Sequence, residues 1–216
     1  MLEIRYVWEF PVRLSHWLNV VSITALCFTG FYIGHPFFSA GEGTWIMGWM
    51  RFLHFAFAYL FAVSVVIRAL WFLIGNPYAS WRMFFPWATQ KGRANALKFF
   101  RYYTFTGKEI PYEVGHNALA CLAYALVFTL YLLQIASGFA LYGQFAPGGL
   151  WDTLFGWLLV WPGAQSLRLG HHFIMWLLIG FVINHIYSAW LMDVKETNGT
   201  ISSMFSGSKY IDPEEL

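Results

Sequence analysis

Two histidines at the ends of one apolar stretch are the residues whose spacing first indicates chemistry. His171 and His185 bound the run HHFIMWLLIGFVINH. Fourteen residues of α-helix advance about 21 Å and bring the side chain back to within about 40° of the same face, so the two imidazoles share a face at two depths. His172 lies about 140° away from His185, and we expect it to face lipid, a neighbouring helix or the membrane interface. His171 is therefore the expected member of a two-level site, while a hydrogen bond between helices explains either histidine alone.

The composition predicts a membrane protein. Of the 216 residues, 58% are hydrophobic and only 11% are charged, whereas about a quarter of the residues in soluble proteins are charged. Four apolar segments reach the roughly 20 residues that a helix needs to cross a bilayer: residues 14–32, 49–74, 117–142 and 171–192. We predict an all-α four-helix bundle that forms a single domain over residues 1–216. Ionisable side chains inside such helices are costly and often mark ion, proton or cofactor sites.

The basic residues predict the orientation of these helices. They gather before the first segment, after the fourth and, most of all, between the second and third, while only Arg51 and Arg168 lie near the other two connections. The positive-inside rule then places both termini and the middle connection of this multi-pass chain in the cytoplasm. The first segment lacks a small-residue cleavage site, so we expect it to be retained. Because the cations are spread among loops, they give no indication of nucleic-acid binding.

The first helix carries a second candidate site. His16 lies at its cytoplasmic entry, at the depth expected for His185 near the cytoplasmic end of the fourth helix. Gly30 follows fourteen residues later on nearly the same face, where a missing side chain would let a bulky planar group approach the backbone. Close helix packing is an equally good explanation of Gly30, because small residues are common in membrane bundles.

The second helix, which is predicted to run from the outer side to the cytoplasmic side, also carries two residues of interest fourteen positions apart. His54 lies near its outer end, level with His171, and Arg68 lies fourteen residues deeper on nearly the same face. An unpaired arginine there would cost several kcal/mol. Since the spans contain no acidic residue, a cofactor carboxylate is one expected partner of Arg68. Snorkelling to the headgroups is the other explanation.

Two connecting segments are predicted to lie at membrane interfaces. Residues 76–115 mix aromatic and basic residues, which indicates an amphipathic helix in the cytoplasmic interface. Residues 151–161 are apolar but too short to span, so we expect them at the outer interface or under a docked partner. We assign no chemistry to the polar tail from residue 193 onward.

The four histidines form two pairs, each drawn from two helices: His16 with His185, and His54 with His171. Ligands of a zinc or copper ion must converge on one point, whereas these two levels are about 21 Å apart. Two histidines per level suit a metal that already has four ligands and needs only two axial ones, as in haem. The spacing therefore predicts two bis-histidine haems.

The chain resembles the b-type cytochrome subunit of membrane-bound nickel-iron hydrogenases, within the cytochrome b561-like group. Four segments carry the resemblance: YVWEFPVRLSHW, RFLHFAFAYLFAVSVVIRALWFLIGN, YEVGHNALA and GHHFIMWLLIGFVINHIYSAW. It implies two b haems with His16, His54, His171 and His185 as axial ligands, and His172 stays the alternative to His171. It also implies that the chain anchors the enzyme and passes electrons to menaquinone or ubiquinone in a respiratory chain. The electrons would come from the iron-sulfur small subunit, which is bound to the large subunit.

The quinone site follows from the resemblance as well. In related cytochromes the polar residues around the glycine before the third helix lie near the quinone, which indicates Tyr112, His116 and Asn117, with Arg13 nearby. We expect electrons to enter at the outer haem and to leave at the inner one, where His116 could hydrogen-bond a quinone carbonyl and relay a proton.

Several alternatives stay open at this point. The chain could serve another periplasmic oxidoreductase, such as a formate dehydrogenase or thiosulfate reductase, act as a stand-alone b561-type reductase, or be a haem-free membrane anchor. A metal or proton transporter is disfavoured, because its relay would be expected to include acidic residues within the spans.

Overall fold

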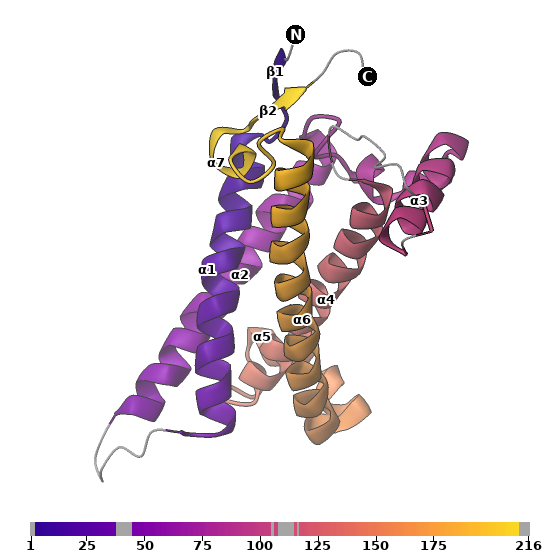
Figure 1. Ribbon diagram of the computed structural model, residues 1–216. Coiled ribbons are helices and arrows are strands. Elements are labelled where there is room, and N and C mark those ends of the chain that lie inside the picture. The colour runs from indigo at the N-terminus through magenta and orange to yellow at the C-terminus, as the bar shows by residue number, and fades with distance from the viewer. Residues whose placement is uncertain (1–2, 38–44, 105, 108–114, 116, 212–216) are drawn as a thin grey trace. The chain divides into compact units, whose positions relative to one another are not determined.

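Four long helices dominate the structure, which is a computed structural model and describes residues 3–37, 45–104, 106–107, 115 and 117–211. They are α1 (Phe10–Gly34), α2 (Ile46–Ile74), α4 (Ala118–Gly143) and α6 (Ala164–Glu196), and each is labelled in Figure 1. All four are long and apolar enough to cross a membrane. The prediction of an all-α protein with four spanning helices is confirmed.

Both the first and the last of these helices begin earlier than predicted. The helix α1 starts at Phe10, with Pro11 in its first turn, where a missing N–H breaks no helical hydrogen bond. The helix α6 starts at Ala164 and includes Arg168. A hydropathy pattern stops at such a charge, but a long side chain at a helix end can extend toward water while the backbone stays helical.

The connections contain short helices. Between α2 and α4 lie η1 (Trp81–Phe84), η2 (Pro86–Ala88) and α3 (Gln90–Tyr103), and the Thr89 hydroxyl caps α3 by accepting from the Gly92 N–H at 3.0 Å. Between α4 and α6 lie α5 (Leu150–Phe155) and the π-helical turn η3 (Leu159–Gly163). The predicted helix between the second and third spans is therefore present, as α3, while its membrane-interface location stays a prediction.

By internal contacts the chain divides into two compact units. Unit 1 comprises Met1–Arg13, Arg68–Thr129 and Gly180–Leu216, and unit 2 comprises Leu14–Ile67 and Leu130–Ile179. The single-domain organisation stays a prediction.

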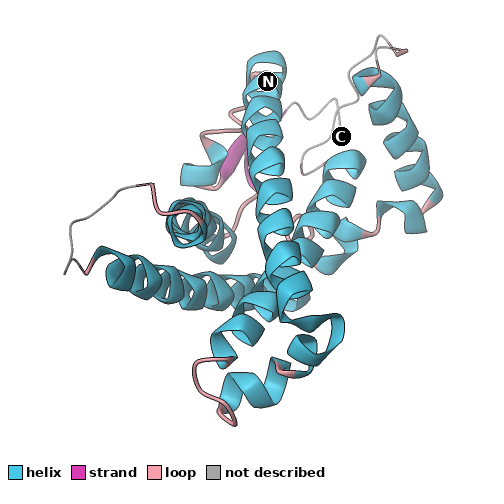
Figure 2. Ribbon diagram, turned by 90° about the horizontal axis from the view of Figure 1, so that it is seen from below, coloured by secondary structure: helices cyan, strands magenta, loops and turns pink. Residues whose placement is uncertain are grey.

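In unit 1, segments from both ends of the chain lie side by side. Strand β1 (Glu3–Tyr6) pairs antiparallel with β2 (Ser208–Ile211), and the short helix α7 (Ser203–Ser206) precedes β2. Figure 1 shows the two strands together near the N and C labels, and Figure 2 draws the strands in magenta among cyan helices. The N–H groups of Val7 and Trp8 both donate to the Gly207 carbonyl, at 2.8 and 2.9 Å. The polar tail, to which the sequence analysis assigned no chemistry, thus folds together with the N-terminal segment. We call this part of unit 1, residues 3–8 and 203–211, the cap.

Glu9 connects this cap to the end of α2. Its carboxylate accepts hydrogen bonds at 2.8 Å from the indole N–H of Trp71 and from the backbone N–H of Asn76. The Asn76 side chain in turn donates to the Val7 carbonyl at 2.9 Å. The three hydrogen bonds join the segment between β1 and α1 to the C-terminal end of α2 within unit 1.

In unit 2, α5 packs on α4 and α2 through aromatic side chains. The Trp151 ring stacks on Phe139, with centroids 4.0 Å apart, and its indole N–H donates to the Tyr59 hydroxyl at 2.7 Å. This packing holds the connection between α4 and α6 against the helices that line the cavity described next.

Candidate functional site

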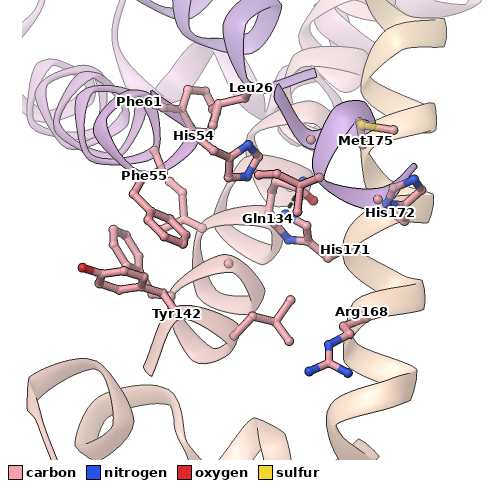
Figure 3. A pocket seen from close by; sticks show the side chains of 18 of the residues that line it. Leu26, His54, Phe55, Phe61, Gln134, Tyr142, Arg168, His171, His172 and Met175 are labelled. Atoms are coloured by element: carbon pink, nitrogen blue, oxygen red, sulfur yellow. Dashed lines mark hydrogen bonds between the residues drawn. The ribbon is translucent and has the colours of Figure 1, made fainter. Parts of the chain in front are cut away.

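Unit 2 contains a cavity of about 490 Å³ that is lined by residues from α1, α2, α4 and α6. This volume lies within the 300–1,000 Å³ typical of sites for small molecules and cofactors. His54 and His171 both line it, together with mostly apolar side chains, and Figure 3 shows the two imidazoles near each other. The structure thus places both histidines at one cavity, and their role as a pair of ligands stays a prediction.

The hydrogen bonds of His54 determine which of its ring nitrogens carries a proton. Nδ1 lies 2.9 Å from the Thr29 hydroxyl oxygen, and that hydroxyl lies 2.7 Å from the Ala25 carbonyl. A hydroxyl has a single proton. Because a carbonyl can only accept, Thr29 donates to Ala25 and accepts from Nδ1–H of His54. The neutral imidazole then keeps its lone pair on Nε2.

His171 has the same arrangement on another helix. Its Nδ1 lies 2.8 Å from the Ser137 hydroxyl oxygen, which donates to the Leu133 carbonyl at 2.7 Å. By the same count of protons, Nδ1 of His171 is the donor and Nε2 carries the lone pair. The Gln134 side-chain nitrogen lies 3.2 Å from Nε2. Gln134 therefore covers the lone pair that a metal would use, and it has to move when a metal binds there.

Glycines make room for each histidine ring of the cavity. A Cβ on Gly30 would lie 3.3 Å from Cε1 of His54, and a Cβ on Gly138 would lie 3.2 Å from Cε1 of His171. Both distances are shorter than ordinary van der Waals contact. Gly30 of α1 thus lies beside the His54 ring of α2. Gly138 of α4 lies in the same way beside the His171 ring of α6, and the sequence analysis missed it.

His172 lines the same cavity as His171, so the expectation that it faces away from that cavity is wrong. Its ring lies 3.2 Å from the position of a Cβ on Gly34 and 6.3 Å, centroid to centroid, from Phe31. Two adjacent residues of α6, His171 and His172, therefore both line the cavity. The hydroxyl partner found for His171 favours His171 as the ligand, and this choice stays a proposal.

The other predicted pair is divided between the two units. In unit 1, Nδ1 of His185 lies 3.2 Å from the Tyr124 hydroxyl, and its ring stacks on Phe181 with centroids 5.5 Å apart. In unit 2, the His16 ring lies edge-on to Trp17, with centroids 5.1 Å apart. The pairing of His16 with His185 stays a prediction.

Arg68 has partners within the protein. Its guanidinium donates to the Ala79 carbonyl at 3.1 Å, lies 4.1 Å from the centroid of the Phe72 ring, and interacts electrostatically with Glu9. The spans contain no acidic residue, as the sequence indicated, but Glu9 precedes the first predicted span and supplies a protein carboxylate near Arg68. Contact between Arg68 and a cofactor stays a prediction.

The residues proposed for quinone binding are only partly described. Tyr112 and His116 lie outside the described residues. The Asn117 side-chain oxygen accepts from the Ala120 N–H at 2.7 Å and so caps α4, and Arg13 donates to the Phe205 carbonyl in the cap of unit 1. The quinone site stays a prediction.

Comparison with known proteins agrees with the resemblance seen in the sequence. The family model described as prokaryotic cytochrome b561 matches residues 7–207. The chain belongs to this family. As a member it is a multi-pass cytochrome b of the bacterial inner membrane.

Relatives of this cytochrome have informative names. A protein of Rhizobium leguminosarum bv. viciae, named probable Ni/Fe-hydrogenase B-type cytochrome subunit, is 39% identical over 97% of this chain and 90% of its own length. One of Rhodobacter capsulatus with the same name is 39% identical over 98% of this chain and 83% of its own. In Escherichia coli K12, the probable Ni/Fe-hydrogenase 1 B-type cytochrome subunit is 33% identical over 94% and 89%.

The unit 2 cavity fits the b-type haem that the cytochrome b family implies. Two neutral imidazoles line it with protonated Nδ1 atoms, and small residues leave space beside each ring. Within the part of the chain that the structure describes, no group of three or more histidine, cysteine or acidic residues could hold a metal ion alone. A metal that brings its own four ligands is consistent with this arrangement.

Proposed function

We propose that this cytochrome is the electron-transfer subunit of a hydrogen:quinone oxidoreductase. It would anchor a periplasmic nickel-iron hydrogenase, whose iron-sulfur small subunit delivers electrons, and pass them to the quinone pool. The names of the relatives and their coverage of nearly the whole chain support this proposal. Two b haems are proposed, one held by His54 and His171 and the other by His16 and His185.

The paired tautomers in unit 2 are the observation that carries the proposal. Thr29 and Ser137 each use their only proton on a backbone carbonyl and accept from a histidine Nδ1–H. Both Nε2 atoms are thereby kept as lone-pair donors, which is the state an axial ligand needs. Bound haem supplies reversible one-electron transfer at that position. The protein would hold the ligands, in a cavity whose lining is mostly apolar.

The quinone end of the proposal relies on residues before α4. His116 and Tyr112 would hydrogen-bond the quinone oxygens, with Asn117 and Arg13 near them, and His116 would exchange a proton with the cytoplasm. If His116→Ala leaves quinone reduction unchanged while the haem content stays the same, this site is wrongly assigned.

Haem content per polypeptide tests the proposal most directly. We expect a dithionite-reduced-minus-oxidised spectrum of the wild type to show about two b haems per chain, and His54→Ala and His171→Ala each to lose about one. His172→Ala and the loop variant His35→Ala are the matched controls and should lose none. Wild type that contains no haem after growth in haem-sufficient cells would favour the haem-free anchor.

Co-purification tests the partner. Recovery of a nickel-iron large subunit and its iron-sulfur small subunit with the tagged chain would support the hydrogenase assignment. Recovery of a formate dehydrogenase or thiosulfate reductase, or of the haem-loaded chain alone, would favour the alternatives.

A further inference from the structure

Two arginines line the unit 2 cavity beside its histidines. Arg51 comes from α2 and Arg168 from α6, and the cavity lining contains no aspartate or glutamate among the described residues. Both side chains are exposed, so each guanidinium keeps its hydration while it adjoins an otherwise apolar space. The cavity thus has two positive charges with no acidic side chain in its lining.

Each arginine occupies the same position relative to a histidine. The segments RFLH and RLGH place Arg51 three residues before His54 and Arg168 three residues before His171. Residues three apart in a helix lie on nearly the same face, separated by about 4.5 Å along the axis. On both helices, therefore, the guanidinium group lies about one turn closer to the N-terminal end of the helix than the imidazole does.

Gln144 orients one of the two guanidinium groups. Its side-chain oxygen accepts a hydrogen bond from Nη2 of Arg168 at 3.1 Å, and it also lines the cavity. Figure 3 shows the Arg168 side chain leaving α6 beyond His171, at one end of the group of labelled residues. With a neutral amide as its partner, Arg168 keeps its charge and further N–H donors for an anion.

We propose that Arg51 and Arg168 form a dicarboxylate site and bind the two propionates of the haem held by His54 and His171. The inference rests on the proposed function. A haem has an apolar macrocycle and two carboxylates on one edge, and this cavity combines apolar walls with two cations on one side of its histidines. A guanidinium pairs with a carboxylate through two parallel hydrogen bonds, which fixes the orientation of the macrocycle as well as its depth.

The phosphate of a lipid headgroup is the other anion that this pair of cations could bind. A comparison of haem with haem dimethyl ester separates the two sources, because the ester has the same macrocycle without carboxylate charges. Apoprotein from cells that cannot make haem is reconstituted with either compound in phosphatidylcholine nanodiscs. The variants are Arg51→Gln, Arg168→Gln and the double variant, and Arg82→Gln, an exposed arginine of unit 1, is the matched control.

We expect wild type and Arg82→Gln to bind haem at this site at least tenfold more tightly than the dimethyl ester. Each single variant should lose about tenfold in haem affinity, as for a lost charge-assisted hydrogen bond, with little change for the ester. In redox titrations of the arginine variants, the midpoint potential of one haem should be lower than in the wild type. A nearby cation favours the more negative reduced form, and the variants lack that cation.

Three results would overturn the inference. Equal losses for haem and its ester would show that the arginines do not recognise carboxylates. Haem binding that is unchanged in the double variant, with less phosphatidylglycerol retained around the protein in mixed-lipid nanodiscs, would assign the cations to lipid. Wild type that binds neither compound would overturn the proposed function as well, so the two failures are distinguishable.

Discussion

Hydroxyl groups beside the histidines are the residue-scale feature that most constrains function. Thr29, Ser137 and Tyr124 each place an oxygen within 3.2 Å of a histidine Nδ1. For His54 and His171 the direction of the hydrogen bond is settled by a competing backbone carbonyl. Partners of this kind fix the ring orientation of a ligand and raise its basicity.

Thr29→Val should weaken haem binding without changing the shape of the cavity. Valine is close in size to threonine but cannot accept from Nδ1–H of His54, so we expect a 10- to 100-fold loss in haem affinity. The midpoint potential should rise, because a less basic imidazole stabilises the oxidised iron less. The measurement is haem titration together with a redox titration.

Thr24→Val is the control for this prediction. Thr24 is on the same helix and its hydroxyl also donates to a backbone carbonyl, that of Val20 at 2.8 Å, but it is exposed and does not line the cavity. If the two variants behave alike, the hydroxyl of Thr29 has no part in ligand positioning.

Glu9→Ala should destabilise unit 1. The substitution removes the acceptor for the Trp71 and Asn76 N–H groups and the charge beside Arg68. An unsatisfied buried polar group costs about 1–3 kcal/mol, and more when it is charged. We expect a lower thermal unfolding midpoint in detergent, whereas Glu3→Ala, at an exposed position of β1, should have little effect. Equal midpoints for the two variants would contradict this role of Glu9.

Sequence alone could predict the histidines and could not predict their neighbours. Ionisable residues at helical spacing within apolar segments are rare enough to single out His54 and His171 as candidate site residues, and both line the cavity. Thr29, Ser137 and Gln134 are ordinary residues of membrane helices, and only the packing of neighbouring helices brings them to an imidazole. The electrostatic partner of Arg68 could not be predicted for a related reason, because Glu9 lies far from it in sequence.

At the scale of elements, apolar length predicted the four helices but not where they end. The interior of each span was predicted correctly, since about 20 apolar residues leave no alternative in a bilayer. The ends depend on caps, prolines and charged side chains, which hydropathy does not capture. The RFLH and RLGH segments show the consequence, because Arg168 lay outside the predicted span and its relation to His171 was missed.

Gly30→Ala should reduce haem occupancy of the unit 2 cavity. The added methyl would lie 3.3 Å from Cε1 of His54, so the ring or the helix has to shift by a few tenths of an ångström. Axial ligation depends on ring position, and we expect the haem count to fall from about two toward one per chain. Gly48→Ala, on the same helix as His54 and with no atom within 4 Å of its new Cβ, should keep the wild-type count. Full occupancy in Gly30→Ala would show that the contact is unimportant.

At the scale of the whole molecule, the fold class was predictable and the cap of unit 1 was not. Antiparallel strands of only four residues leave almost no periodic signal, and β1 and β2 are separated by some 200 residues of sequence. Their pairing follows from the tertiary structure around them, including the buried Val7, Trp8 and Ser203 side chains. A charged residue is buried there too, since Lys209 on β2 is 4% exposed.

Lys209 should make the stability of unit 1 depend on pH. Burial lowers the pKa of Lys209 below its ordinary 10.5, although the carboxylates of Glu196 and Asp193 act in the opposite direction. The folded state therefore releases this proton at a lower pH than the unfolded state does. The cost of burying the charge is fully present below the folded pKa, and stability rises as pH increases from there toward 10.5.

Unfolding midpoints measured between neutral pH and about 10.5 would test this dependence. The rise in unfolding midpoint with pH that Lys209 causes should be absent in Lys209→Met. It should persist in Lys98→Met, which removes an exposed lysine of α3. Identical pH profiles for wild type and Lys209→Met would contradict it.

The pairing of β1 with β2 also sets an order of events during synthesis. The ribosome makes residues 3–6 first, but their partners, residues 208–211, emerge only after all four spanning helices have been translated. A chain that stops before residue 207 would therefore leave the Val7 and Trp8 N–H groups without the Gly207 carbonyl. Trp8, which is 4% exposed in the folded protein and donates its indole N–H to the Ser203 hydroxyl, would then be accessible to proteases in a chain truncated before residue 203.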